Sequence, residues 1–327
     1  MNKKESIVLI LAGGKGTRLW PLSDEKTPKQ LLKINGKDEM INISCKRVEE
    51  IIFKKNIHIV TNKESAKKIK KVTKNKNVII ENVSIGTLYS VRYALEEILK
   101  KGKDEIVLIM PSDQFVFEEE KFKKAIKKAF DVAKETNEIV LIATKTKTLE
   151  TRFGYILTNK DVKYENNKVI SEIKFLEKPT KEKIKLMTMD YNFYKNTGMI
   201  VCKTKTLISK INEKMGLKSD IKEKQIIEKC KNISIDVGVL EKNKDTKVII
   251  SDFKWIDIGT FEGLEEVINK DKNQNLIVGN VDIINSQNLI VYDGRKHIED
   301  KVRIEGVKDL VIALSNSGVL IREKFKK

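Results

Sequence analysis

The chain has 327 residues, of which 40% are hydrophobic and 34% charged, and its formal net charge at pH 7 is +18. This length allows about two domains with a sizeable core, and the composition is typical of a globular protein. No apolar run approaches the roughly 20 residues of a membrane-spanning helix, and the segment before the first predicted strand is too short for a signal peptide. Three scattered cysteines without metal-ligand spacing favour a reducing compartment, so we expect a cytoplasmic protein with no membrane partner.

Lysines supply the excess positive charge, but they are spread through nearly every polar segment and interleaved with Glu and Asp. This distribution predicts a solvated surface rather than a basic patch for nucleic acid, so no nucleic-acid partner is expected. The excess charge still favours anionic substrates electrostatically.

The uninterrupted apolar run over residues 7–12 predicts a strand buried on both faces. Glycines end this strand within four positions: Gly13, Gly14 and Gly16. Their backbone N–H groups can close on a ligand because no Cβ intervenes. Three cations lie in the same short span: Lys15, Arg18 and Lys29. Strand, glycines and cations together indicate a nucleotide-phosphate site at the end of a parallel sheet.

The spacing of these glycines fits neither of two common phosphate-binding loops. The P-loop needs G-x-x-x-x-G-K-[ST], and in the dinucleotide fingerprint G-x-G-x-x-G the last glycine would stand at Leu19. The alternative is a glycine turn with solvated cations.

Apolar β-rich runs then alternate with amphipathic helical runs. Strands are expected at residues 57–61, 77–81, 105–110 and 138–143, and helices at 63–73, 86–101 and 119–134. Further strands are expected at 169–176, 197–203 and 246–252, and further helices at 181–189 and 217–232. This order predicts the α/β class, with a Rossmann-like mixed, mainly parallel sheet flanked by helices.

The pattern changes after residue 270. Short β-like runs follow, separated by turns, at 279–284, 288–292, 301–305, 310–314 and 318–321. We therefore predict a first domain over residues 1–268 and a small all-β domain over 269–327, with no long linker between them.

The stretch from Gly13 to Ser23, together with Pro28-Lys29-Gln30, resembles the signature of the sugar-nucleotidyltransferases. Trp20 within it resembles the mannose-1-phosphate guanylyltransferase (GDP-mannose pyrophosphorylase) branch. Seven ordered motifs carry the resemblance over much of the chain. It implies the nucleotide-diphospho-sugar transferase fold, and the last residues resemble the left-handed β-helix-like domain of these enzymes.

Two acids carry the expected metal chemistry. Asp113 lies just past the strand at 105–110, where open α/β sheets keep their ligand sites. Asp257, in Trp255-Ile256-Asp257-Ile258-Gly259-Thr260, resembles the family's W-x-D-x-G-[ST] element. By itself Asp113 would be a helix cap and Asp257 a turn residue; the resemblance implies that both hold Mg²⁺ or another divalent cation.

The remaining motifs resemble the nucleotide and sugar sites of the family. Nucleotide binding is implied for Leu11, Ala12, Gly13, Gly14, Lys15, Gly16, Thr17, Arg18, Glu81, Thr87, Pro111 and Asp113. Sugar-phosphate binding is implied for Lys29, Gly154, Tyr155, Glu177, Lys178, Asn196, Asp236 and Lys242. Catalytic roles are implied for Arg18, Lys29, Asp113 and Lys178.

The reaction implied is transfer of GMP from GTP to mannose 1-phosphate, giving GDP-mannose and pyrophosphate. The loop from Glu81 to Thr87 lacks the Pro and Arg of the mannose branch. Another sugar 1-phosphate, such as a heptose or glucose phosphate, or another NTP therefore stays open. So do a non-catalytic sugar-nucleotide-binding regulator, and a homodimer as the oligomeric state.

Overall fold

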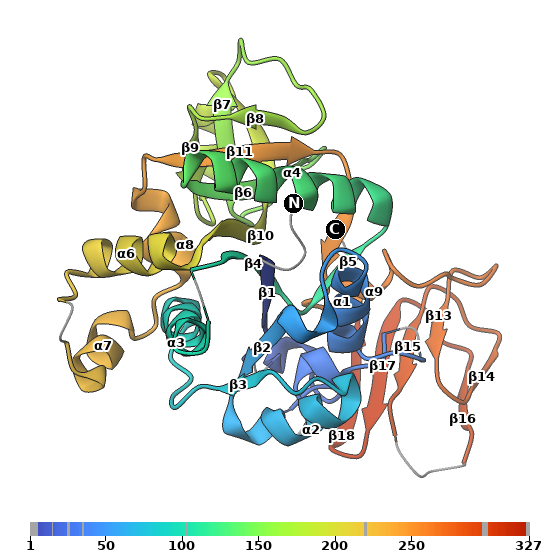
Figure 1. Cartoon of the computed structure of the whole chain (residues 1–327). Helices are drawn as coiled ribbons and strands as arrows, with labels where there is room; N and C mark the ends of the chain where they lie inside the picture. Colours follow the sequence, from blue (N-terminus) through green and yellow to red (C-terminus); the bar gives the residue numbers. More distant parts are fainter. Residues whose placement is uncertain are drawn as a thin grey trace.

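The computed structural model describes residues 6–14, 16–24, 27–34, 36–102, 104–218, 221–295 and 300–324. Within this part of the chain, ten strands form one mixed sheet at the centre of the molecule (Figure 1). The main path runs β3-β2-β1-β4-β10-β6-β11-β8, and β7 and β9 extend from β10. The strands β3, β2, β1 and β4 are parallel, whereas β10 runs antiparallel to β4 and β6.

The strands of this sheet are β1 (Ser6–Leu11), β2 (Ile57–Thr61), β3 (Val78–Ile80), β4 (Ile106–Pro111), β6 (Ile139–Lys145), β7 (Tyr155–Asn159), β8 (Lys168–Ile170), β9 (Lys174–Leu176), β10 (Tyr191–Lys203) and β11 (Thr246–Ser251). A separate pair, β5 (Gln114–Val116) and β12 (Trp255–Asp257), is antiparallel.

The helices are α1 (Met40–Glu49), α2 (Lys63–Thr73), α3 (Thr87–Leu99), α4 (Glu119–Thr136), α5 (Lys181–Met187), α6 (Thr204–Met215), α7 (Glu223–Cys230), α8 (Ile235–Gly238) and α9 (Phe261–Leu264). Short 3-10 turns are η1 (Thr17–Leu19), η2 (Lys29–Leu31), η3 (Lys54–Asn56) and η4 (Leu240–Lys242). None of the described helices has the length and apolar character needed to cross a membrane.

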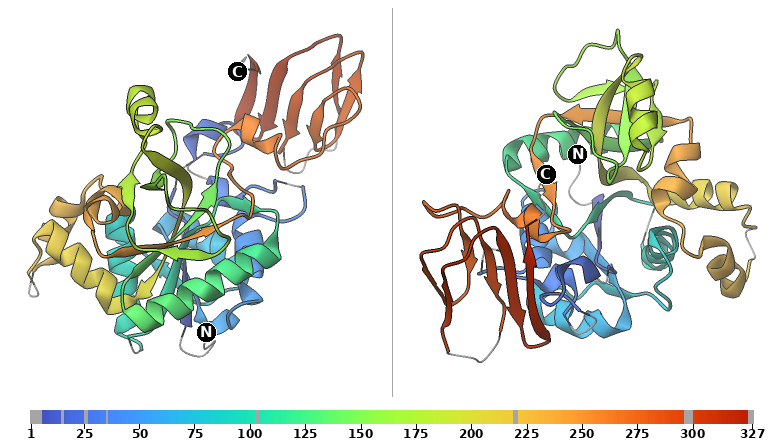
Figure 2. Two further views of the ribbon diagram at one scale, coloured as in Figure 1. Left: turned by 90° about the horizontal axis from the view of Figure 1, so that it is seen from above. Right: turned by 180° about the vertical axis from the view of Figure 1, so that it is seen from behind.

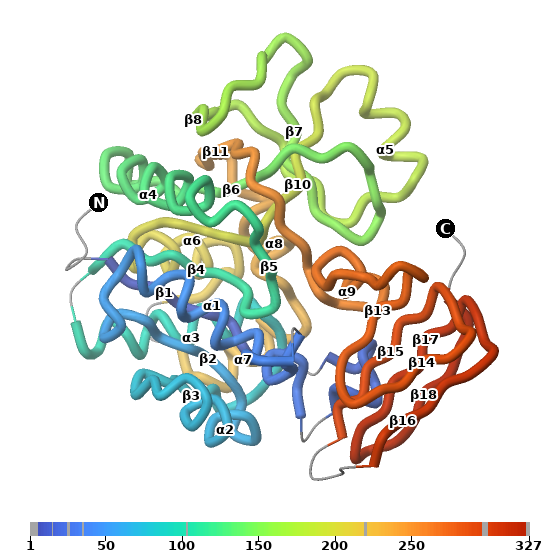
Figure 3. Tube along the Cα trace, turned by 90° about the vertical axis from the view of Figure 1, so that its right-hand side faces the viewer, coloured from blue at the N-terminus to red at the C-terminus, as the bar shows by residue number. Residues whose placement is uncertain are grey.

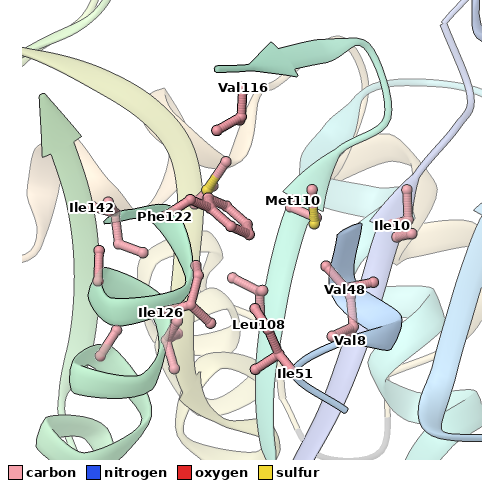
Figure 4. Packing of buried hydrophobic residues seen from close by; sticks show 14 of the residues in the cluster. Val8, Ile10, Val48, Ile51, Leu108, Met110, Val116, Phe122, Ile126 and Ile142 are labelled. Atoms are coloured by element: carbon pink, nitrogen blue, oxygen red, sulfur yellow. The ribbon is translucent and has the colours of Figure 1, made fainter. Parts of the chain in front are cut away.

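Two hydrophobic cores lie on the two faces of the sheet. One joins α1, α2 and α4 to the strands; Figure 4 shows Leu108 and Met110 of β4 between Phe122 of α4 on one side and Val8, Ile10 and Val48 on the other. The other joins α3, α6, α7 and α8 to the opposite face, with Leu9 of β1 in its centre. Alternate residues of β1 thus enter different cores, which is why its sequence is apolar throughout. The predicted α/β class and flanking helices are confirmed.

Three predicted elements differ from the structure. The run at 169–176 is two strands, because β8 pairs with β11 whereas β9 pairs with β7. The helix expected at 217–232 is α7 alone. The sequence prediction missed α6, which ends at Gly216 in a left-handed conformation; there the Leu217 N–H donates to the Asn212 carbonyl at 2.8 Å. The strand expected at 197–203 begins earlier, at Tyr191.

The C-terminal residues form two small sheets that stand beside the main body (Figure 2). One contains β13 (Leu276–Val278), β15 (Ile290–Asp293), β17 (Leu310–Ser315) and β18 (Gly318–Glu323), and the other contains β14 (Val281–Ile284) and β16 (Val302–Glu305). All pairs are parallel except β17 with β18. We call this region the C-terminal β unit. The left-handed twist of its coils and the boundary at residue 268 stay predictions.

A third core joins the C-terminal β unit to the chain after the first strand. Leu19, Leu22 and Leu32, from the segment that follows the glycines, pack with Ile290 and Val311 of the β unit. Residues that flank Asp257 belong to the same core: Ile256 and Ile258. Figure 3 shows this unit on one side of the molecule and β7, β8 and α5 on another.

Candidate active site

The glycine loop after β1 is fixed by contacts from two directions. The carbonyl oxygen of Ala12 accepts hydrogen bonds from the side-chain amide of Gln30 at 2.7 Å and from the Thr61 hydroxyl at 2.8 Å. Gly16 has a φ of 68°, and a Cβ there would lie 2.6 Å from the Cβ of Lys29. Only glycine therefore lets the loop close onto Lys29.

The ends of β1 and β4 lie side by side under this loop. Leu11 is opposite Pro111 in the parallel pair, and the Leu11 carbonyl accepts the N–H of Ser112 at 3.2 Å. On its other side Pro111 approaches Gly198 of β10, where a Cβ would lie 3.4 Å from the Pro111 ring. The loop side and the β10 side of the site therefore share this sheet edge.

The two predicted metal acids are neighbours although 144 positions separate them. Asp113 directly precedes β5, and Asp257 is the last residue of β12 and pairs with Gln114. The N–H of Ile258 also donates to the Asp113 carbonyl at 3.3 Å. Antiparallel pairing of β5 and β12 is thus what joins the two acids.

Lys29 is the lysine that forms an ion pair with one of these two acids. Its ammonium forms an ion pair with the Oδ2 atom of Asp113, and both side chains are mostly buried. Burial lowers the pKa of Lys29; the Asp257 carboxylate opposes this shift and the Arg18 guanidinium adds to it. These four charged groups therefore share one electrostatic environment.

The surroundings of Asp257 show whether the acid pair fits the expected divalent cation. Its Oδ1 atom is buried and has no hydrogen-bond partner among the described residues, which is costly unless a ligand completes it. The described residues contain no group of three or more His, Cys, Asp or Glu side chains that could hold a metal. Mg²⁺ is commonly bound by one or two carboxylates plus substrate phosphates, so Asp113 and Asp257 fit such an ion.

Arg18 lies in η1, at the mouth of the site. Its side chain is exposed and approaches Gly259, where a Cβ would lie 3.0 Å from the Nη2 atom. Thr17 beside it is exposed, and its carbonyl accepts the N–H of Trp20 at 3.2 Å. Lys15, predicted to bind the nucleotide, lies outside the described residues.

Glu81 lies beside the glycine loop on the side of β3. Its side chain is 4% exposed, and its two carboxylate oxygens accept hydrogen bonds from the hydroxyls of Ser84 and Ser90. A Cβ at Gly13 would lie 3.2 Å from the Oε1 atom of Glu81. A carboxylate oxygen has room for a second donor, so Glu81 can still accept hydrogen bonds from a ligand on the loop.

Thr87, also predicted in the nucleotide site, has a structural contact. It is the first residue of α3, and its hydroxyl accepts the N–H of Ile235 at 3.0 Å. Thr87 thereby links the loop after β3 to α8, which carries Asp236 on the sugar side.

The predicted sugar residues come from four segments that meet around Asn196. Its side-chain amide donates to Asp236 at 3.1 Å, and its N–H donates to the Gly154 carbonyl at 2.9 Å. A Cβ at Gly154 would collide with the Glu177 carboxylate. Burial, reinforced by the charge of Glu177, raises the pKa of Asp236 to about 6. The structure therefore groups Gly154, Glu177, Asn196 and Asp236; we call these four residues the sugar cluster.

Two predicted lysines lie at the edge of the sugar cluster. Lys178 is exposed with a φ of 40°, and its ammonium pairs with Glu177 at 2.6 Å. Lys242 is exposed in η4, and no hydrogen bond or ion pair joins its ammonium to the cluster in the described part of the chain.

Tyr155 is predicted to bind the sugar phosphate, but the structure places its side chain in the core, so only its backbone is left for such a contact. The residue is 0% exposed, its ring packs against Phe193, and its hydroxyl is satisfied by the backbone of Glu150 at 2.7 and 2.9 Å. The alternation of β7 explains this result, because a residue next to Gly154 in the strand points into the core.

The C-terminal β unit holds the segment that carries Arg18 and Lys29. The Tyr292 hydroxyl donates to the Lys33 carbonyl at 2.6 Å, and the Ser315 hydroxyl donates to the Pro21 carbonyl at 2.6 Å. These two hydrogen bonds join the β unit to the segment on the other side of the third core. We call them the clamp. The sequence predicted no long linker between the first domain and the β unit, but it did not identify these residues.

Sequence reasoning also missed Ser84, Ser90 and Lys195. The two serines could have been suspected only from their closeness to Glu81 in the chain. Lys195 directly precedes Asn196, and its ammonium lies over the rings of Phe153 and Trp255.

Comparison with known proteins identifies the family and the fold. The model of the nucleotidyl transferase family matches residues 7–274. Mannose-1-phosphate guanylyltransferase of Klebsiella pneumoniae is 26% identical over 97% of this chain and 70% of its own length. Alginate biosynthesis protein AlgA of Pseudomonas aeruginosa is 26% identical over 97% and 69%. A Thermus thermophilus structure described as mannose-1-phosphate geranyltransferase superposes with a TM-score of 0.80 at 22% identity, covering 98% of this chain and 95% of that one.

Proposed function

The chain belongs to the nucleotidyl transferase family, and from this membership we propose that it transfers GMP from GTP to mannose 1-phosphate and releases pyrophosphate. The observation that carries the chemistry is the grouping of Lys29, Asp113 and Asp257 beside the glycine loop. The choice of GTP and mannose 1-phosphate is supported by similar proteins named mannose-1-phosphate guanylyltransferase.

The reaction needs no general base in this chain. A sugar 1-phosphate is already anionic at neutral pH, because its second pKa is about 6. One of its phosphate oxygens bonds to the α-phosphorus of the NTP, and the bond from that phosphorus to the bridging oxygen breaks, so pyrophosphate leaves. Catalysis then consists of positioning and charge neutralisation.

Each charged residue has a distinct task in this proposal. Lys29, beside the glycine loop, neutralises the sugar phosphate where it meets the NTP, and Arg18 holds the leaving pyrophosphate. Asp113 and Asp257 are the residues that would hold a divalent cation, whose chemistry there is to neutralise charge on the attacked phosphate. Lys178 neutralises the sugar-phosphate side.

Glu81 supports guanine as the base. The Watson–Crick edge of guanine presents two adjacent donors, N1–H and N2–H₂, and a carboxylate is an acceptor for both. Uracil and thymine present one donor at this edge, so they would give Glu81 one hydrogen bond fewer than guanine does. One such hydrogen bond contributes roughly 1 kcal/mol, or more because the acceptor is charged.

The test is an activity matrix of four NTPs against mannose, glucose and heptose 1-phosphates, read by pyrophosphate release. We expect the highest kcat/KM for GTP with mannose 1-phosphate, and a Glu81→Gln variant that loses preference among the NTPs. Highest activity with UTP or dTTP and glucose 1-phosphate would overturn the proposal. GTP with another manno-configured phosphate would overturn only the sugar.

A further inference from the structure

Lys195 occupies an unusual place for a lysine. It lies on β10, opposite Tyr155 of β7 and Thr144 of β6, and it is only partly exposed. Its Nζ atom is 3.3 Å from the ring centroid of Phe153 and 4.5 Å from that of Trp255. The two aromatic faces therefore hold the ammonium in place at the edge of the site.

No carboxylate lies within ion-pair distance of this ammonium in the described part of the chain. The charges that act on it do so from farther away: Glu150, Arg152, Glu266 and Asp257. Burial lowers the pKa of Lys195 to about 8, so the ammonium is still mostly protonated at neutral pH. A partly desolvated cation without a direct counter-charge favours an anionic ligand.

The position of Lys195 relates it to both halves of the site. Trp255 and Asp257 are two positions apart on β12, so their side chains project from the same face of that strand. The ammonium lies over the Trp255 ring, and the Asp257 carboxylate acts on it electrostatically by raising its pKa. The next residue of β10 is Asn196 of the sugar cluster, whose side chain projects from the opposite face of the strand. The ammonium of Lys195 therefore lies on the side of the acid pair, one strand position away from the sugar cluster.

We propose that Lys195 binds the phosphate of the sugar 1-phosphate as it approaches the NTP, which makes it a further substrate-binding residue of the proposed reaction. The inference rests on the proposed function only in that the second substrate is a sugar 1-phosphate. Lys178 is less suited to carry this phosphate alone, because its ammonium is exposed and already paired with Glu177. The ammonium of Lys195 needs no exchange of partner to accept it.

The experiment compares Lys195→Met with a matched control. Lys145→Met removes another lysine ammonium that lies over an aromatic ring, 3.2 Å from the centroid of Tyr164, but that is not among the charges that act on Lys29 or Lys195. Loss of a charge-assisted hydrogen bond should raise the KM for the sugar 1-phosphate roughly 10- to 100-fold. The KM for the NTP should stay within about twofold, and Lys195→Arg should restore part of the loss.

A binding measurement separates this inference from the choice of substrates. Titration of mannose 1-phosphate and glucose 1-phosphate is followed by tryptophan emission, since the ammonium lies over the Trp255 ring, with a non-hydrolysable NTP present. Wild type should respond to at least one of these phosphates, whereas Lys195→Met should not, whichever pair the activity matrix selects. Lys195→Gln is the second variant if Lys195→Met does not fold.

Two results would overturn the inference. One is a sugar-phosphate KM in the folded Lys195 variant within twofold of wild type. The other is an equal rise of both KM values that Lys145→Met reproduces, which would assign Lys195 to packing of the aromatic rings.

Discussion

The phosphate side of the site, around Lys29, Asp113 and Asp257, is backed by the third core and the clamp, whereas the sugar cluster is backed by neither. On the phosphate side a buried ion pair joins Lys29 to Asp113. In the sugar cluster, two carboxylates stand close together, and their cation, Lys178, is exposed.

This difference has a physical rationale. Phosphoryl chemistry depends on groups that are already oriented where charge develops, and a buried, cross-braced segment provides this. In the proposed reaction, hydroxyl groups of the sugar donate hydrogen bonds to the carboxylates of Glu177 and Asp236. Under this proposal, binding of the sugar relieves the unfavourable closeness of the two acids.

The largest expected effect comes from removing either acid of the pair. Asp113→Asn and Asp257→Asn should each lower kcat at least about 100-fold, because such a stabiliser contributes roughly 3 kcal/mol in the transition state. Asp245→Asn is the control, since Asp245 pairs with Lys210 on an exposed surface. Steady-state rates over a Mg²⁺ titration provide the measurement, with circular dichroism to verify folding. Near-wild-type Mg²⁺-dependent rates in either variant would remove that acid from the metal site.

Loss of the two clamp hydrogen bonds should change the kinetics less than loss of either acid, because neither bond involves the acid pair. Tyr292→Phe combined with Ser315→Ala removes two hydrogen bonds, each worth about 1 kcal/mol, and loosens the segment with Arg18 and Lys29. We expect the KM for GTP to rise roughly two- to tenfold, with a smaller rise in the KM for the sugar phosphate, because the ion pair with Asp113 still holds Lys29. Ser286→Ala is the matched control, because its hydroxyl donates to the Ile284 carbonyl at 2.8 Å inside the β unit. Equal kinetic effects in both variants would show that the clamp acts only through stability.

The raised pKa of Asp236 in the sugar cluster predicts that the free energy of unfolding depends on pH. The pKa of Asp236 in the folded protein, about 6, is above its ordinary value of 3.8, so the folded state holds the proton more tightly. This stabilisation is complete below about pH 4 and is lost as pH rises through about 6. Asp236→Asn should therefore be more stable than wild type at pH 7.5, by ~1–3 kcal/mol, with a smaller advantage at pH 4.5. Urea denaturation at both pH values measures this difference. An equal gain in the free energy of unfolding at both pH values would contradict the raised pKa of Asp236.

The same carboxylate predicts a modest kinetic effect. If Asp236 binds the sugar as proposed, it accepts the hydrogen bonds fully only when ionised, so kcat/KM for the sugar phosphate should rise through about pH 6. The sugar phosphate itself titrates near pH 6, so the profile of Asp236→Asn serves as the reference. The ratio of the two profiles should still change with pH; a constant ratio would assign the whole dependence to the substrate.

The phosphate side was the easier part to predict from the sequence. Residues 7–12 and the glycines after them are contiguous, and their apolar run and spacing carry the information locally. Asp257 was found through a motif, but its contact with Asp113 needed the pairing of β12 with β5.

The sugar cluster depends more on tertiary structure. Asn196, Asp236 and Gly154 come from separate segments, and the sequence did not tell which side chains face inward. The burial of the Tyr155 side chain was not predicted, because a motif names a residue but not its face of the strand. Lys195 was missed because its significance comes from Phe153 and Trp255, which are distant in sequence.

The separation of the two sides is tested most directly by the KM values of Arg18→Ala and Lys178→Ala for both substrates. Arg18→Ala should raise the KM for GTP about tenfold or more and leave that for mannose 1-phosphate nearly unchanged. Lys178→Ala should do the opposite with a smaller change, because its exposed ion pair is screened by solvent. If both variants raised only the KM for GTP, Lys178 would not belong to the sugar side and the two-sided account would be contradicted.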